Sequence, residues 1–139
     1  MKISILTVGK IKEKYFNDAF AEYTKRLSRY CNLEILEVAD EKTPDHASEA
    51  LCVQIKEKEG ERLLRLIRED AYVIALAIDG KSMTSEQLAG KIDGLGVRGV
   101  SHIQFIIGGS LGLSDAVLKR ADEHLSFSAM TFPHQLMRV

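Results

Sequence analysis

The chain has 139 residues, of which 45% are hydrophobic and 28% are charged, and this is ordinary for one globular domain. No apolar run approaches the roughly 18 residues of a membrane span, and the first residues lead into a strand pattern rather than a signal peptide. The net charge of −1 does not by itself indicate a nucleic-acid binder. We expect a single domain over residues 1–139, cytoplasmic and with no membrane partner.

Basic residues are concentrated near the N-terminus, where Lys and Arg outnumber the acidic residues among the first thirty positions. This excess could face the phosphates of a nucleic acid, and a solvated helix face is an equally good interpretation. Cys31 and Cys52 lack the spacing of a metal or redox motif, so we expect two free thiols.

The first predicted strand covers residues 3–8 and is closed by Gly9. In the helix that follows, apolar residues recur at spacings of four and three, so this stripe should face the sheet. Its members are Phe16, Phe20, Tyr23, Leu27 and Tyr30. A second strand is predicted over residues 33–38, and the polar stretch 40–46 behind it is the longest expected loop.

Residues 48–68 alternate charged and apolar side chains, as on an amphipathic surface helix, and Gly60 should weaken its middle. Residues 72–78 are apolar at nearly every position, which is typical of a strand covered on both faces, and we place this strand at the sheet centre. Strands that alternate with helices along the whole chain indicate the α/β class, with a mostly parallel sheet flanked by helices.

Residues Thr84–Gln87 resemble a capping box that opens a helix, which the glycines at 94, 96 and 99 should end. A strand over 103–107 leads into a glycine turn, after which Ser114 can cap another helix. The last predicted strand is 125–127, and Pro133 suits the first turn of a final helix.

The glycine turn at Gly108-Gly109 is the first candidate binding feature. A strand that ends in Gly-Gly-Ser brings bare backbone to the carboxyl edge of the sheet, where open α/β sheets bind ligands. The turn fits neither the dinucleotide fingerprint nor a phosphate loop, and a simple tight turn is an equally good interpretation.

The segment Ser126–Pro133 is the second feature. It places Phe127, Met130 and Phe132 among small hydroxyl residues, a composition that could wrap an adenosine or merely fill the core. The four histidines show no metal-like spacing, and no serine, histidine and acid arrangement is recognisable, so we expect no metal and no hydrolase.

Three stretches resemble the ribosomal large subunit methyltransferase H family, which is of the SPOUT class. They are Ile107–Ser110 with Gly112, Leu125–Ser128 and Met130–Arg138. The stretches Val8–Lys12 and Lys56–Gly60 look like this family too, so the resemblance covers essentially the whole chain.

The resemblance implies a SPOUT fold whose C-terminal part forms a deep trefoil knot, an exception to the rule that chains do not thread. It also implies methylation of N3 of a pseudouridine in 23S ribosomal RNA, on assembled ribosomes, by a homodimer that uses S-adenosylmethionine. Carried onto this sequence, the cofactor contacts fall on Leu76, Gly108, Phe127, Ser128, Ala129, Met130, Thr131 and Phe132.

The catalytic half of the site is less complete. His134 and Arg138 follow the loop, so we select them as candidate catalytic residues, with His134 as the candidate general base. Position 129 is commonly lysine in the family and is alanine here, which would remove a basic side chain near RNA. Family members continue beyond Arg138-Val139 with a helix and tail implicated in substrate binding or catalysis, so we expect a truncated chain.

Two other functions stay open from the residues alone. A nucleotide-binding or regulatory α/β module without catalysis would need no more than the glycine turn. An inactive truncated SPOUT fragment would keep the fold and lose the activity.

Overall fold

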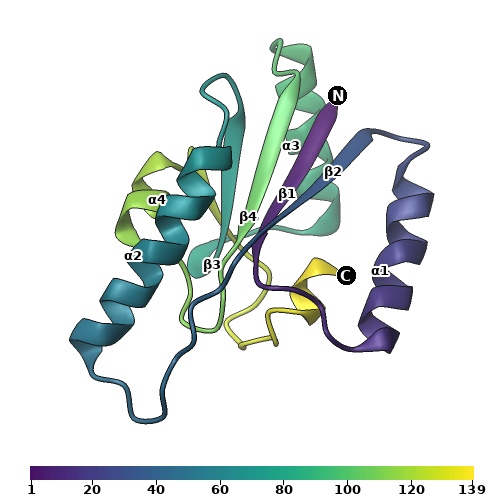
Figure 1. The fold of residues 1–139 in the computed structure, drawn as a ribbon. Coiled ribbons are helices and arrows are strands. Elements are labelled where there is room, and N and C mark those ends of the chain that lie inside the picture. The colour runs from purple at the N-terminus through teal and green to yellow at the C-terminus, as the bar shows by residue number, and fades with distance from the viewer.

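The structure is a computed structural model that describes residues 1–139. Five strands alternate with four α-helices, and a short 3₁₀ helix, η1, closes the chain (Figure 1). The strands are β1 (Lys2–Val8), β2 (Asn32–Val38), β3 (Tyr72–Ser82), β4 (His102–Ile107) and β5 (Glu123–Ser126). The helices are α1 (Lys14–Leu27), α2 (Glu49–Leu66), α3 (Ser85–Val97), α4 (Asp115–Arg120) and η1 (Leu136–Arg138).

All strand pairs are parallel, in the order β2-β1-β4-β3-β5, so the predicted α/β class with a parallel sheet is confirmed. The prediction that residues 72–78 form the sheet centre is wrong, because β4 occupies that place and β3 lies beside it. Burial on both faces makes a strand apolar wherever it lies inside a sheet. β4 was not recognised as the central strand, because its sequence contains the polar residue Gln104, which is buried in the structure. The amide of Gln104 accepts from Arg68 N at 2.8 Å and donates to Leu66 O at 3.1 Å.

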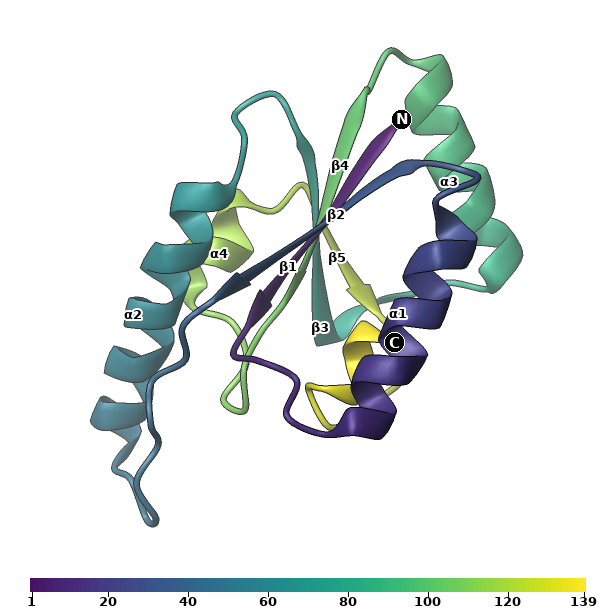
Figure 2. The ribbon, with the colours of Figure 1, turned by 45° about the vertical axis from the view of Figure 1, so that its right-hand side comes forward.

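Helices cover both faces of the sheet, with α2 and α4 on one side and α1 and α3 on the other (Figure 2). The two faces carry separate apolar cores. The core beneath α2 and α4 contains Leu6, Val8, Leu63, Val73, Ile106 and Val117, and the core beneath α3 contains Ile74, Leu95, Ile103 and Leu125. This three-layer arrangement leaves the carboxyl ends of the strands, at the bottom of Figure 1, free to carry loops.

Side-chain caps begin three of the helices. Ser48 accepts from Leu51 N at 3.1 Å at the start of α2, and Ser114 accepts from Val117 N at 3.4 Å at the start of α4. At α3, Thr84 and Gln87 form the complete capping box that was predicted. Each cap satisfies a backbone donor that the first helical turn would otherwise leave unpaired.

Gly60, which was predicted to weaken the middle of α2, does not interrupt this helix. The helix runs unbroken through Gly60, which is buried where α2 crosses the beginning of α4. A Cβ at this position would lie 3.0 Å from Ser114 Cβ and 3.3 Å from Val117 Cγ2. The glycine therefore permits the close approach of two helices. The glycines at 94 and 96 likewise fail to break α3, which ends at Val97.

Helix α1 differs most from its prediction. Its apolar stripe was expected to face the sheet, yet the helix has no buried residue, and Tyr15, Tyr23 and Leu27 are exposed. Phe16 and Phe20 are half-buried, so only the N-terminal part of the stripe packs against the rest of the protein. Because α1 lies beside the edge strand β2, little sheet surface is left for it to cover.

The C-terminal segment also departs in detail from its prediction. Strand β5 ends at Ser126, where its pairing with Ser82 of β3 stops, so Phe127 belongs to the following loop. In place of the final helix predicted from Pro133, the structure has the short 3₁₀ helix η1 over Leu136–Arg138. The trefoil knot stays a prediction.

Two glycine substitutions test the close approach of α2 and α4. Gly60→Ala should lower the free energy of unfolding by roughly 1–3 kcal/mol, because its methyl group has no room beside Ser114. Gly90→Ala, in the open middle of α3, should raise it by roughly 0.5–1 kcal/mol through helix propensity. Urea denaturation of both variants measures these changes, and equal effects at the two positions would refute the packing role of Gly60.

Candidate functional site

A tight glycine turn forms one wall of the candidate site, at the carboxyl end of β4. Gly109 and Gly112 form an isolated antiparallel bridge, with Gly112 N donating to Gly109 O at 3.1 Å. Gly112 has φ +89°, and a Cβ on Gly108 would lie 2.7 Å from the carbonyl carbon of Gly112. The turn therefore requires glycine at these positions and presents bare backbone above the sheet.

A bulge in β3 forms the floor beside this turn. β3 pairs with β5 up to Leu76 and resumes at Lys81, so residues 77–80 leave the ladder. Gly80 lies so close to β5 that a Cβ there would be 2.7 Å from the carbonyl carbon of His124. Bulges commonly redirect backbone next to functional sites, and this one turns Leu76, Ala77 and Ile78 toward the open end of the sheet.

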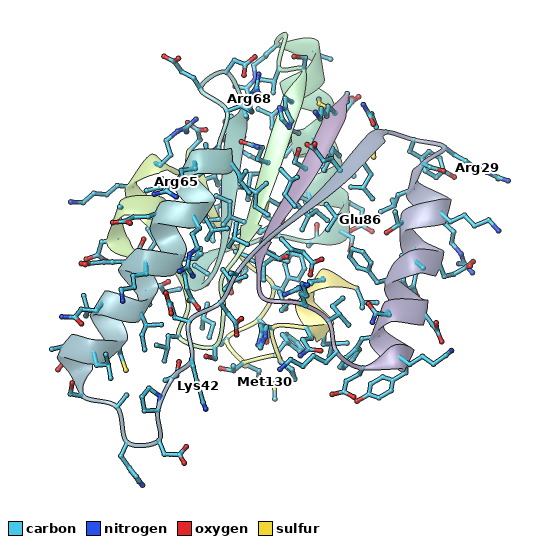
Figure 3. All side chains as sticks on the ribbon, in the orientation of Figure 1. Arg29, Lys42, Arg65, Arg68, Glu86 and Met130 are labelled. Atoms are coloured by element: carbon cyan, nitrogen blue, oxygen red, sulfur yellow. The ribbon has the colours of Figure 1, made fainter.

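The loop after β5 forms the opposite wall. Ser126 Oγ donates to Ser128 O at 3.1 Å, and Met130 N donates to Ser128 Oγ at 3.0 Å, so hydroxyl groups hold the loop in shape. Its large apolar side chains are exposed, with Met130, labelled in the lower middle of Figure 3, accessible over 75% of its surface. Exposed apolar side chains above a sheet edge are typical of a ligand-binding surface.

Together the two walls and the floor line a hollow of about 650 Å³, within the size range of small-molecule sites. Seven of the eight residues predicted to contact the cofactor line it, namely Leu76, Gly108, Phe127, Ser128, Met130, Thr131 and Phe132. Ala129 is not among the lining residues. The hollow is also lined by Ala77, Ile78, Ser110 and Leu111, which sequence reasoning missed because no local pattern marks a bulge or the tip of a turn.

The two candidate catalytic residues lie in different surroundings. His134 lines the hollow and is half-buried. Burial lowers the pKa of His134 below its ordinary 6.5, the charge of Arg138 lowers it further, and Asp40 opposes both effects. The imidazole is therefore neutral at physiological pH and able to accept a proton. Arg138 does not line the hollow.

Arg138 instead joins the C-terminal segment to the sheet. Its guanidinium is buried and donates to Val8 O at 2.7 Å, to Gly9 O at 2.9 Å and to Glu37 Oε2 at 2.9 Å. Burial lowers the pKa of Arg138, while the Glu37 carboxylate raises it. A second link runs from Lys12 N to Gln135 Oε1, at 3.2 Å. In this structure the arginine anchors the loop that carries His134.

A serine, a histidine and an acid do meet in this fold, although the sequence pattern did not reveal them. Ser4 Oγ donates to Glu34 Oε2 at 2.9 Å and lies 2.7 Å from His102 Nε2, at the amino ends of the strands. The serine stands between the acid and the histidine, whereas a hydrolase needs the histidine in the middle. The cluster is therefore a polar link across β2, β1 and β4, and no hydrolase site.

The fold and the hollow define a class that sequence comparison identifies. The family described as "Predicted SPOUT methyltransferase" matches the chain over residues 1–139. Relatives named "Ribosomal RNA large subunit methyltransferase H" align with all 139 residues: 71% identical in Bifidobacterium adolescentis, 63% in Bifidobacterium animalis subsp. lactis and 63% in Bacillus pumilus. Each alignment covers 100% of this chain and 87% of the relative. The chain belongs to the ribosomal RNA large subunit methyltransferase H family of SPOUT methyltransferases.

None of the helices combines the length and apolarity needed to cross a membrane. No group of three or more His, Cys, Asp or Glu side chains is arranged to hold a metal ion.

Replacing Arg138 distinguishes an anchoring role from a catalytic one. Arg138→Ala should lower the free energy of unfolding by about 2–3 kcal/mol, because charge-assisted hydrogen bonds to Val8 O and Gly9 O are lost inside the protein. Urea denaturation measures the change, and Lys58→Ala on the exposed face of α2 serves as a control within about 0.5 kcal/mol of wild type. Unchanged stability with lost methyl transfer would show instead that Arg138 acts in catalysis.

Proposed function

We propose that this protein transfers a methyl group from S-adenosylmethionine to N3 of a pseudouridine in 23S ribosomal RNA, within assembled ribosomes. SPOUT methyltransferases generally depend on this cofactor, and the names of the relatives state a ribosomal RNA substrate. The observation that carries the proposal is the hollow between the Gly108–Gly112 turn and the loop after β5, which unites nearly all the expected cofactor contacts.

The residues of the hollow fit the cofactor in size and chemistry. Apolar side chains of Leu76, Ile78 and Ile107 supply flat walls for adenine, and the turn at Gly108 leaves backbone groups accessible for the edge of the base and for the ribose. Ser128 and Thr131 add hydroxyl groups. Backbone contacts by residues 127–132 would tolerate alanine at position 129, where the side chain does not line the hollow.

When bound, S-adenosylmethionine supplies an electrophilic methyl group on a sulfonium centre. The protein's task is to hold the acceptor nitrogen in line with that carbon, which by itself can supply much of the acceleration. His134 would accept the N3 proton of the base, since it lines the hollow and its lowered pKa keeps the ring neutral. Activity should accordingly decline only as the pH falls through the pKa of His134, below 6.5.

A second hollow of about 500 Å³ adjoins the first and offers a place for the acceptor base. It shares Leu125, Phe127, Phe132 and Met137 with the cofactor hollow, so the two spaces meet at these side chains. Aromatic rings are the usual stacking surface for an unpaired RNA base. We assign the pseudouridine to the place where the two hollows meet, so that its N3 faces the cofactor hollow, which His134 lines.

A methyl-transfer assay tests the function. Chain incubated with methyl-labelled S-adenosylmethionine and unmodified ribosomes should place label in 23S ribosomal RNA, and mass spectrometry of the nucleosides should find methylpseudouridine. His134→Gln should lower kcat about 100-fold while the Kd for the cofactor stays within about twofold.

Calorimetry with S-adenosylmethionine runs in parallel with this assay. Binding of other nucleotides without S-adenosylmethionine would favour a non-catalytic module. Cofactor binding without transfer to ribosomes would contradict the proposed substrate and favour an inactive form.

We further propose that the chain acts as a homodimer in which α1 faces the partner. The helix leaves Tyr15, Tyr23 and Leu27 open to solvent, and just beyond its end Tyr30 is exposed over 80% of its surface. Patches of this kind on a folded chain are typical of association surfaces. The hydrogen bond from Lys12 to Gln135 places the beginning of α1 next to the loop of the site, so a dimer through α1 would adjoin the hollow.

Sedimentation equilibrium tests the dimer. Tyr23→Lys with Leu27→Lys should weaken self-association by about 100-fold, because both charges would be buried in the interface. Val97→Lys, at an exposed apolar position on α3, should leave the dimer intact. A wild-type chain that sediments as a monomer at high micromolar concentration would overturn this part of the proposal.

A further inference from the structure

Glu59 is a buried carboxylate within the charged run of α2, and neither the fold nor the chemistry described above explains it. Its neighbours Glu57 and Lys58 are exposed, whereas Glu59 is 5% exposed. Burial raises the pKa of Glu59, and the carboxylates of Asp40 and Glu41 raise it further, while the hydrogen bond from Glu41 N and the charge of Arg62 oppose them. Burying a carboxyl group costs free energy unless hydrogen bonds compensate for it, so the contacts of Glu59 should show why it is buried.

The contacts of Glu59 lead to two loops at the carboxyl edge of the sheet. Glu59 Oε2 accepts from Glu41 N at 3.0 Å, in the loop that follows β2. Arg62, one helical turn away, secures the same loop by donating to Ala39 O at 2.8 Å and to Glu41 Oε1 at 2.6 Å. The beginning of this loop is therefore fixed against α2.

The second loop is the glycine turn. A Cβ on Gly109 would lie 3.2 Å from Glu59 Oε1 and 3.2 Å from Val8 Cγ1, so the carboxylate occupies the space that a side chain on the turn would need. Glu59 does not line the hollow, whereas Gly109 does. Glu59 is therefore not in direct contact with the hollow, and Gly109 is the lining residue that lies against it.

We propose that Glu59 is a positioning residue for the methyl donor, which supports the Gly108–Gly109 turn from behind and ties it to the loop at Glu41. This inference rests on the proposed use of S-adenosylmethionine. The side chain is needed for its shape and its acceptor oxygens, and it takes no part in the chemistry. Glutamine, which keeps one oxygen and the same length, should therefore replace it.

Calorimetry with S-adenosylmethionine tests the proposal on the whole chain. Glu59→Ala should weaken cofactor binding about tenfold, since the turn loses its support and Glu41 N loses its acceptor. Glu59→Gln should bind within about twofold of wild type. Glu59→Asp, which keeps the charge and withdraws the oxygens by one methylene group, should bind about threefold more weakly. Glu57→Ala, at an exposed position of the same helix, is the matched control and should bind like wild type.

A double-mutant cycle with Gly109→Ala shows whether the effect passes through the turn. In the wild-type background the methyl group of Gly109→Ala crowds the Glu59 carboxylate. Gly109→Ala should therefore weaken cofactor binding less when Glu59 is already alanine. In steady-state assays Glu59→Ala should raise KM for the cofactor and leave kcat at saturation within about threefold.

Several results would overturn the positioning role. Unchanged cofactor affinity in Glu59→Ala would do so, and if that variant fails to fold, unchanged affinity in Glu59→Asp decides in the same way. Equal weakening in Glu59→Gln and Glu59→Ala would show that the charge is what matters. Additive effects in the cycle would exclude transmission through Gly109. If the wild-type chain itself does not bind S-adenosylmethionine, the proposed function fails together with this inference, and that result is distinct from the others.

Discussion

The position of the C-terminal segment depends on one buried guanidinium. Arg138 reaches the carbonyl oxygens of Val8 and Gly9, where β1 ends, and its third hydrogen bond goes to Glu37 on β2. Because these bonds anchor the far end of the loop after β5, the residues between Phe127 and His134 are held across the glycine turn. Burying a cation is unfavourable, and here three oxygens offset that cost while Arg138 Nε stays unpaired.

Features that depend on a few adjacent residues could be predicted from the sequence. The predicted caps Thr84 and Ser114 are found in the structure, because a side-chain oxygen reaches a donor three residues ahead. Each strand and helix was likewise recognised from the spacing of nearby apolar residues, and their alternation along the chain indicated the α/β class. The glycine turn was recognisable as a turn, yet its meaning came from family resemblance, because a Gly-Gly pair has the same appearance with or without a ligand.

Features that depend on partners distant in the chain could not be predicted. Gly60 looked like a defect in α2 until Ser114, more than fifty residues later, proved to occupy the space above it. Glu59 was indistinguishable from the solvated charges around it, since the loop at Glu41 and the turn at Gly109, both distant in the chain, lie against it. The stripe on α1 had the spacing of a core-facing helix, and spacing alone cannot state whether a protein's own sheet or another surface covers it.

Sheet order explains why two segments some twenty residues apart form one hollow. β4 carries the glycine turn and β5 carries the opposite loop, and β3 lies between them, so the walls are separated by the width of one strand. An unbroken β3 would fill that gap with its own ladder. The bulge at residues 77–80 removes the ladder at this level, and the absence of a side chain on Gly80 lets the chain pass close to His124. The volume of the site is therefore a consequence of irregular strand pairing, which residue types alone do not encode.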